Sequence, residues 1–129
     1  MFDWRRPKNL GVKEGRLAPC RRTPNCVSSQ ADPADREHYI APIAFRGAMT
    51  DLRRAVESMK RASVIKAEGN YLYAEYRTRL MRYVDDVELH YDERQGLVHV
   101  RSASRLGRRD FGVNRKRVEA LRSLIQAPR

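Results

Sequence analysis

The sequence predicts one α+β domain, in which an antiparallel sheet of three to four strands is flanked by an amphipathic helix and a C-terminal helix. Two segments, residues 50–61 and 114–126, repeat their apolar side chains at helical spacing. The residues between them alternate apolar and polar side chains, and short connections make the alternating segments antiparallel neighbours. With 129 residues, of which 41% are hydrophobic, the chain supports one modest core.

Residues 1–47 show little periodicity, and five prolines interrupt them. Such a segment predicts an extended N-terminal arm packed on an α+β core that spans residues 48–129. The short polar side chains around Cys26 favour turns there. The side chains expected to anchor the arm are Tyr39, Ile40, Ile43 and Phe45.

Each predicted helix begins with a residue that suits a helix N-terminus, Thr50 in the first and Asn114 in the second. The first apolar stripe consists of Leu52, Ala55, Val56 and Met59. The second consists of Val118, Leu121, Leu124 and Ile125, and Ala127-Pro128 ends that helix. We expect both helices to cover one face of the sheet.

Four segments alternate in the manner of strands, at residues 63–68, 71–79, 83–91 and 97–105. Turn residues separate them at Gly69-Asn70 and Gln95-Gly96. The alternation gathers charged and polar side chains on one sheet face: Glu75, Asp86, Glu88, His99 and Arg101, with Arg77 and Arg105 nearby.

This charged face has two interpretations. One is a solvated surface with ion pairs across the strands, each worth less than about 1 kcal/mol. The other is a polar groove in which Arg101 and Arg105 hold an anion or a carboxylate. Asp85 and Asp86 are expected to point to opposite faces of a regular strand, which argues against a shared catalytic pair.

The change from strand to helix within residues 96–117 holds the candidate ligand-binding side chains. These are Arg101, Ser104, Arg105 and Arg115, facing Asp86 and Glu88. Backbone N–H groups at 114–117 could hold phosphate or carboxylate, or Asp110 could fill that position from within the chain. The sequence has no nucleophile elbow, P-loop or dinucleotide fingerprint, so we expect no catalytic residues and no cofactor.

The two cysteines, Cys20 and Cys26, are candidates for a structural or redox role. Their spacing is neither a C-x-x-C redox motif nor part of a zinc-finger pattern, so we expect no metal. A local disulfide is geometrically possible and would stabilise the fold by about 2 kcal/mol. In a reducing cytoplasm two free thiols are expected instead.

The formal net charge is +11, and the basic excess lies in the two ends of the chain. Residues 1–22 carry seven basic and two acidic groups, and residues 101–129 carry nine and two. No apolar run is long enough for a membrane span, and no secretory leader precedes the domain, so we expect a cytoplasmic protein.

Three functions remain open. The leading one is a non-enzymatic domain that binds a small anionic ligand or a protein partner. The second is nucleic-acid binding through the basic ends, with Trp4, Tyr71 and Tyr73 as stacking groups. The third is an enzyme that uses Asp86, Glu88 and His99, although no triad or metal set supports it.

Three motifs in this order resemble the family of domain of unknown function 1499, between Leu10 and Arg122: LGVKEGRLAPCRRTPNCVSSQ, YLYAEYRTRLMRYVDDVELHYD and VHVRSASRLGRRDFGVNRKRVEALR. The resemblance implies a small bacterial or plastid domain without an accepted reaction. Matching positions are Cys20, Pro24, Asn25, Cys26, Ser28, Ser29, Glu75, Asp85, Asp86, Glu88, Arg101, Ser102, Ser104, Arg105, Gly107, Asp110, Gly112, Asn114 and Arg115. Some relatives resemble exported or organellar proteins, in which a Cys20–Cys26 disulfide would be natural. Arg108-Arg109 departs from the less charged pair expected there.

Overall fold

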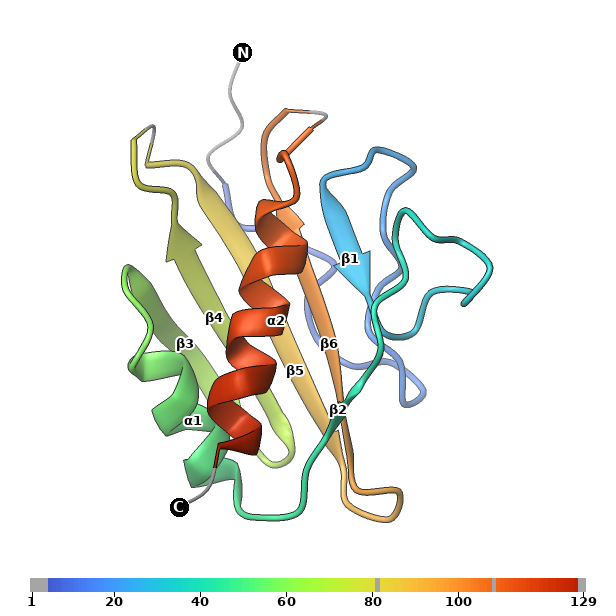
Figure 1. Ribbon diagram of the computed structural model, residues 1–129, viewed down its shortest axis with the longest axis vertical. Coiled ribbons are helices and arrows are strands. Elements are labelled where there is room, and N and C mark those ends of the chain that lie inside the picture. Colours follow the sequence, from blue (N-terminus) through green and yellow to red (C-terminus); the bar gives the residue numbers. More distant parts are fainter. Residues whose placement is uncertain (1–4, 81, 108, 128–129) are drawn as a thin grey trace.

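The computed structural model describes residues 5–80, 82–107 and 109–127, and it forms one antiparallel sheet with two helices. The sheet has six strands in the order β1-β6-β5-β4-β3, with β2 also paired to β6 (Figure 1). The four longer strands are β3 (Ala62–Glu68), β4 (Tyr71–Arg77), β5 (Val84–Asp92) and β6 (Leu97–Ser104). The predicted α+β class is confirmed, whereas the prediction of three to four strands is wrong.

The additional strands are short and lie within the segment expected to be an arm. They are β1 (Cys26–Ser28) and β2 (Ile43–Ala44), and both pair with β6. Cys26 itself lies opposite Ala103 in the sheet, and the expected turn follows it, where Ser28 Oγ accepts a hydrogen bond from the backbone N–H of Gln30. With three and two residues, β1 and β2 are too short for the alternation of a strand to be visible in the sequence.

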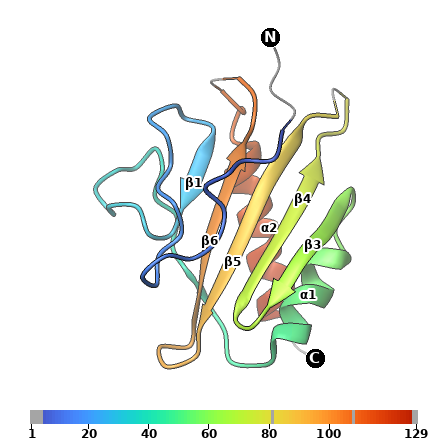
Figure 2. The same ribbon diagram turned by 180° about the vertical axis from the view of Figure 1, so that it is seen from behind.

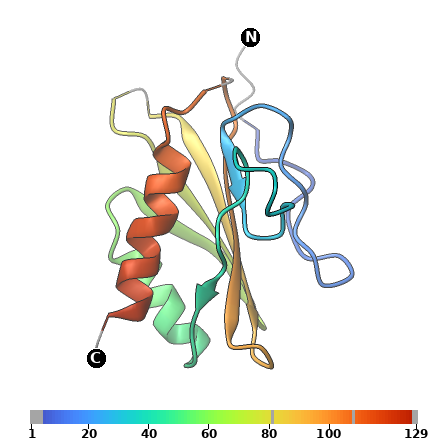
Figure 3. The ribbon, with the colours of Figure 1, turned by 45° about the vertical axis from the view of Figure 1, so that its right-hand side comes forward.

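Both helices lie on the same face of the sheet, as Figures 1 and 3 show. The first, α1 (Met49–Glu57), contacts β3, and the second, α2 (Val113–Gln126), contacts β6, β1 and α1. Their predicted stripes enter the core at Leu52, Val56, Val118, Leu121 and Ile125. Leu124, expected in the second stripe, is instead exposed.

The predicted first residues of the helices are wrong. Ala48, and not Thr50, precedes α1, and the backbone N–H of Ala48 donates to the carboxylate of Asp51 at 3.0 Å. Gly112 precedes α2 with a φ of 79°, and Asn114 lies inside the helix. The first backbone N–H groups of a helix have no acceptor within the helix. In α2 the carboxylate of Asp110 supplies one, since its Oδ2 accepts from the Asn114 backbone N–H at 3.0 Å. Pro128 lies outside the described residues.

The two faces of the sheet have different covers. The helices and the apolar face enclose the core, which includes Leu72, Val87, Leu89, Val98 and Val100. A leading segment, residues 5–24, crosses the opposite face over β5 and β6 (Figure 2). Within the described part of the chain, neither helix combines the length and the apolar character that a membrane crossing requires.

Candidate functional site

The face under the leading segment gathers buried charges, and we call it the polar face. Antiparallel pairing places Glu75 opposite Asp86 on the neighbouring strand, and Glu88 opposite Arg101. The alternation in the sequence predicted this grouping, and the register confirms it. The interpretation as a solvated surface is wrong, because each of these four residues is at most 9% exposed.

Arg105 links the carboxylates at one end of the polar face. Its Nε and Nη2 donate to the two carboxylate oxygens of Asp86, each at 2.9 Å. Nη2 also lies 2.6 Å from Glu75 Oε2, and that same oxygen accepts a hydrogen bond from Arg6 Nε at 2.7 Å. The Tyr73 hydroxyl donates to Asp86 and lies 2.7 Å from Glu75. Two arginines therefore neutralise two carboxylates.

These contacts keep Glu75 and Arg105 charged at neutral pH. Burial alone would raise the pKa of Glu75, but hydrogen bonds from Arg6, Tyr73 and Arg105 outweigh it and lower the pKa to about 2. Hydrogen bonding to Asp86 raises the pKa of Arg105. Burial raises the pKa of Tyr73, and its hydrogen bond to Asp86 acts in the same direction.

Glu88 holds the leading segment against the sheet. This carboxylate is fully buried, and its Oε2 accepts hydrogen bonds from the Tyr71 hydroxyl at 2.6 Å and from the Gly11 backbone N–H at 2.7 Å. Burial and the hydrogen bond to Glu88 raise the pKa of Tyr71. Glu88 therefore fixes a segment that lies 77 positions away along the chain.

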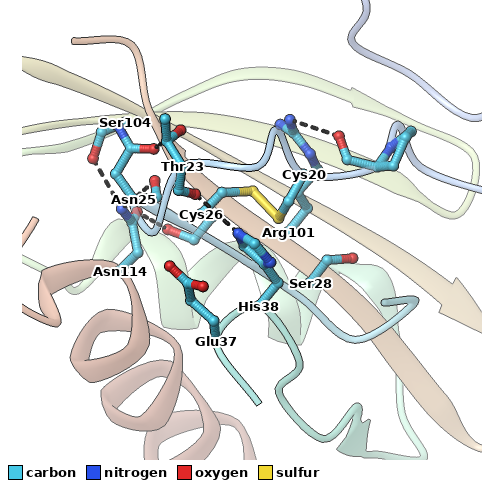
Figure 4. Close-up of a disulfide and its surroundings, with 12 residues drawn as sticks. Cys20, Thr23, Asn25, Cys26, Ser28, Glu37, His38, Arg101, Ser104 and Asn114 are labelled. Carbon is cyan, nitrogen blue, oxygen red and sulfur yellow. Dashed lines mark hydrogen bonds between the residues drawn. A yellow bond between two sulfur atoms is a disulfide. The ribbon is translucent and has the colours of Figure 1, made fainter. Parts of the chain in front are cut away.

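Arg101 is less completely paired than Arg105. Arg101 is only 6% exposed, yet its Nη1 lies 3.9 Å from the nearest carboxylate oxygen, Glu88 Oε1. Its Nη2 donates to the carbonyl of Pro19 at 3.3 Å, and its Nε has no hydrogen-bond partner within the described chain. Figure 4 shows this side chain in the region of the disulfide. Burial lowers the pKa of Arg101, although Glu88 opposes this shift.

A cavity of about 450 Å³ lies between the leading segment and the polar face, and we call it the sheet-face cavity. Six of its lining residues are cationic and one, Asp86, is acidic. The cationic residues are Arg5, Arg6, Lys8, Arg21, Arg101 and Arg105. Such a lining suits phosphate or carboxylate groups, which arginine binds through its planar set of N–H donors.

The structure brings four of the predicted ligand-binding residues together and separates two. Asp86, Arg101, Ser104 and Arg105 line the sheet-face cavity. Glu88 is not among its lining residues, since the carboxylate is buried beside Gly11. Arg115 lines another cavity of about 510 Å³, where it donates to the carbonyls of Arg36 and Glu37.

The cations supplied by the leading segment were not predicted as site residues. Arg5, Arg6, Lys8 and Arg21 reach the cavity from a part of the sequence without periodicity. The available signal was electrostatic, because residues 1–22 carry a net +5 while the predicted sheet face carries three carboxylates. Opposite charges of this size favour contact between the two segments.

Asp85 and Asp86 point to opposite faces, as the strand pattern predicted. Asp86 joins Arg105 on the polar face, whereas Asp85 Oδ2 lies 2.8 Å from Arg117 Nη2 on the helix side. Burial raises the pKa of Asp85, and Arg117 only partly offsets this effect. The two carboxylates therefore do not form a catalytic pair.

A disulfide joins Cys20 to Cys26, so the expectation of free thiols is wrong (Figure 4). The chain turns back between them, which brings their Cα atoms within 5.6 Å, inside the range that a disulfide spans. The bond attaches the leading segment to β1 beside the sheet-face cavity, which Cys26 lines. Disulfides persist in oxidising compartments, and the expected cytoplasmic location stays a prediction.

The residues named for the other two functions are arranged differently from what those functions need. Tyr71 and Tyr73 donate to buried carboxylates under the leading segment, and Tyr73 is itself buried, so its ring cannot stack on bases. Trp4 and Arg108 lie outside the described residues. Asp86 lines the sheet-face cavity, but Glu88 and His99 do not. His99 Nδ1 instead lies 3.2 Å from Ser29 Oγ, and burial lowers its pKa. No three His, Cys, Asp or Glu side chains form a metal-binding group among the described residues.

Comparison with known proteins gives a family and no activity. A family model described as Protein of unknown function (DUF1499) matches residues 16–125. No curated protein and no solved structure matches the chain. The matched range includes the disulfide, the polar face and the start of α2, which agrees with the resemblance seen in the sequence motifs. The chain therefore belongs to the DUF1499 family of proteins of unknown function.

Proposed function

We propose that the chain is a non-enzymatic binding domain that holds a small anionic ligand in the sheet-face cavity. The observation that carries this proposal is the incomplete pairing of Arg101. Its buried guanidinium lines the cavity, its nearest carboxylate oxygen is 3.9 Å away, and its Nε lacks a partner within the described chain. A buried charge without close partners is costly, and an anionic group beside it would lower that cost.

The charges around the cavity support a ligand that carries phosphate or carboxylate groups. Arg6 and Arg105 are occupied by Glu75 and Asp86, which they neutralise. Lys8, Arg21 and Arg101 remain as cationic lining beyond that network. A ligand with two negative charges therefore suits the cavity better than a neutral one.

Ser104 also lines the sheet-face cavity, but its side chain takes part in contacts on the helix side of the sheet. Its side-chain oxygen accepts a hydrogen bond from Asn114 Nδ2 at 2.9 Å. The hydroxyl also forms a hydrogen bond with Asp85 that lowers the pKa of that carboxyl, so its own proton is already donated on the helix side of the sheet. Arg101 and Arg21 would therefore supply the charge that holds the anion, without a hydrogen bond from the Ser104 hydroxyl.

Thermal unfolding with added anions tests this proposal. Inorganic phosphate and citrate serve as probes at constant ionic strength, and the two variants are Arg101→Gln and Arg115→Gln. Either anion at about 100 times its Kd would stabilise the wild-type protein by about 2.7 kcal/mol, which raises Tm by several degrees. Arg101→Gln should lose this rise.

The second variant removes the same charge from a different cavity. Arg115→Gln should respond to the anions as the wild-type protein does, because Arg115 lies outside the sheet-face cavity. Equal losses in both variants would show a general effect of net charge. That result, or an unchanged response of Arg101→Gln, would contradict the proposed site.

A further inference from the structure

A second basic cavity lies on the helix side of the sheet, and we call it the helix-end cavity. It measures about 450 Å³ and is formed where β4 ends, where α1 leads into β3, and where α2 begins. Six cationic side chains line it, and no carboxylate does so within the described chain. They are Lys60, Arg61, Arg77, Arg79, Lys116 and Arg117.

The fold neutralises only part of this charge. Arg117 pairs with Asp85 and lies over the Tyr76 ring at 4.9 Å from its centre. Arg61 Nε donates to the backbone carbonyl of Arg77, which leaves its positive charge in place. Among the described residues, the five cations other than Arg117 form no ion pair with a carboxylate. The helix-end cavity therefore presents a concentrated positive potential to the outside.

Two exposed apolar side chains are close in the sequence to residues that line this cavity, although neither of them lines it. Leu80 directly follows the lining residue Arg79, and Phe111 comes two positions before the lining residue Val113. Leu80 and Phe111 are each 87% exposed, more than any other large hydrophobic residue that the structure describes. The described parts of the loops that carry them, residues 78–80 and 82–83 and residues 105–107 and 109–112, lie at the same end of the molecule (Figure 1).

Neither packing nor backbone geometry accounts for a phenylalanine at position 111. Its ring makes little contact with the core, and its φ is 55°, in the left-handed region. Bulky residues rarely adopt that conformation, which suits glycine and asparagine far better. An aromatic ring in this place therefore costs folding stability without serving the core.

We propose that this end of the molecule docks on an anionic phospholipid surface. Lipid phosphates would occupy the helix-end cavity, while Leu80 and Phe111 would enter the boundary between the headgroups and the acyl chains. Basic side chains beside apolar ones are the combination that such a surface attracts. Nucleic acid offers phosphates as well, but it offers no apolar layer for a leucine. This site is separate from the sheet-face cavity and does not depend on its ligand.

Sedimentation with lipid vesicles tests the docking surface. One set of vesicles contains phosphatidylcholine alone, and the other contains phosphatidylcholine mixed with phosphatidylglycerol. We expect binding to the mixed vesicles and not to the neutral ones, with a decrease as salt is raised. The double variant Leu80→Ser with Phe111→Asn should weaken binding by about tenfold or more, because it removes the apolar contribution. Asparagine tolerates the left-handed backbone, so this variant should keep the fold.

Leu124→Ser is the matched control, because Leu124 is exposed on α2 and lies outside the helix-end cavity. It should bind the mixed vesicles as the wild-type protein does. A third variant, Arg79→Gln with Lys116→Gln, should lose binding through its charge, and thermal unfolding should show that it remains folded.

Three results would overturn the docking surface. One is the absence of binding to the mixed vesicles at low salt. Another is equal binding by wild type and by Leu80→Ser with Phe111→Asn. The last is binding to single-stranded RNA through Arg79 and Lys116 without any binding to vesicles.

Discussion

Arg101 and Arg105 show how one residue type takes two roles on the same face of a sheet. Arg105 lies just beyond β6, where Glu75 and Asp86 present oxygens at 2.6–2.9 Å. Arg101 lies at mid-strand opposite Glu88, whose Oε2 is already occupied by a tyrosine hydroxyl and a backbone N–H. The first arginine therefore completes the fold, and the second keeps donor capacity for a ligand.

The depressed pKa of Glu75 predicts a specific dependence of stability on pH. The pKa is about 2 in the folded protein against 4.5 for an ordinary glutamate, so ionised Glu75 favours the folded state above pH 4.5. This contribution is lost as the pH falls from 4.5 towards 2, and it amounts to at most about 3 kcal/mol. The free-energy gap between wild type and Glu75→Gln should therefore narrow across that range, which urea denaturation measures.

Glu57→Gln provides the control for this prediction. Glu57 is an exposed residue of α1 that pairs with the exposed Arg53 at 3.3 Å, and an ion pair of this kind contributes little to stability. Its gap to the wild-type protein should stay near zero from pH 7 to pH 2. A constant gap for Glu75→Gln would contradict the role assigned to the Arg6–Glu75–Arg105 contacts.

At the scale of elements, the sequence predicts those strands that are long enough to repeat an alternation of apolar and polar side chains. Strands β4, β5 and β6 have seven to nine residues, so their alternation separates Val87 from Asp86 and Glu88. Strands β1 and β2 have three and two residues and show no such pattern. Their pairing depends on β6, which follows them by more than 50 positions.

The candidate site likewise has residues that a local pattern predicted and residues that no local pattern could predict. Asp86, Arg101 and Arg105 come from segments that alternate in the sequence, and this alternation predicted that they share one sheet face. The cations of the leading segment reach the cavity only because side chains such as Arg6 find partners 69 positions away. Contacts at such separations leave no local pattern, so only the charge of residues 1–22 indicated them.

The junction between β6 and α2 depends on one buried amide, that of Asn114. Its side chain accepts from Ser102 Oγ at 2.6 Å and donates to the carbonyl of Asn25 at 3.1 Å and to Asp110 at 2.6 Å. Asn114→Ala would leave these buried groups without partners, which should destabilise the protein by about 2–4 kcal/mol. Chemical denaturation measures this loss.

Asn70→Ala is the matched control for the amide at position 114. Asn70 lies in the turn between β3 and β4, and its side chain donates to the exposed Glu93 at 3.1 Å. Its removal should change the free energy of unfolding by less than about 0.5 kcal/mol. Similar effects of the two variants would show that the buried contacts of Asn114 do not anchor α2.

At the scale of the whole molecule, the sheet lies between two covers of different chemistry. The apolar sides of two amphipathic helices cover one face, and a basic leading segment covers a face with three buried carboxylates. The second cover compensates charge and not only apolar area, so it depends on Arg6, Gly11 and the disulfide. Both proposed binding sites lie where a cover ends: the sheet-face cavity beside the leading segment, and the helix-end cavity at the first turn of α2.

This arrangement predicts a local and a global consequence of removing the disulfide. Cys20→Ser with Cys26→Ser should lower the free energy of unfolding by about 2 kcal/mol, because the short loop is no longer closed in the unfolded chain. The leading segment should also detach more often from the polar face. Hydrogen exchange at the Gly11 amide, which donates to buried Glu88, should become faster. Hydrogen exchange of the β5 amides that pair with β4 should become faster only by the factor that the loss of global stability accounts for.

The wild-type protein under a reducing agent provides an independent comparison, and it should match the double variant in both measurements. Phosphate or citrate should also stabilise the variant less than the wild-type protein, since Arg21 then loses its fixed position beside the sheet-face cavity. Exchange at Gly11 that changes only in proportion to global stability would contradict this prediction. In that case Glu88 and Arg6 would hold the leading segment in place without the disulfide, and the covalent bond would contribute to stability alone.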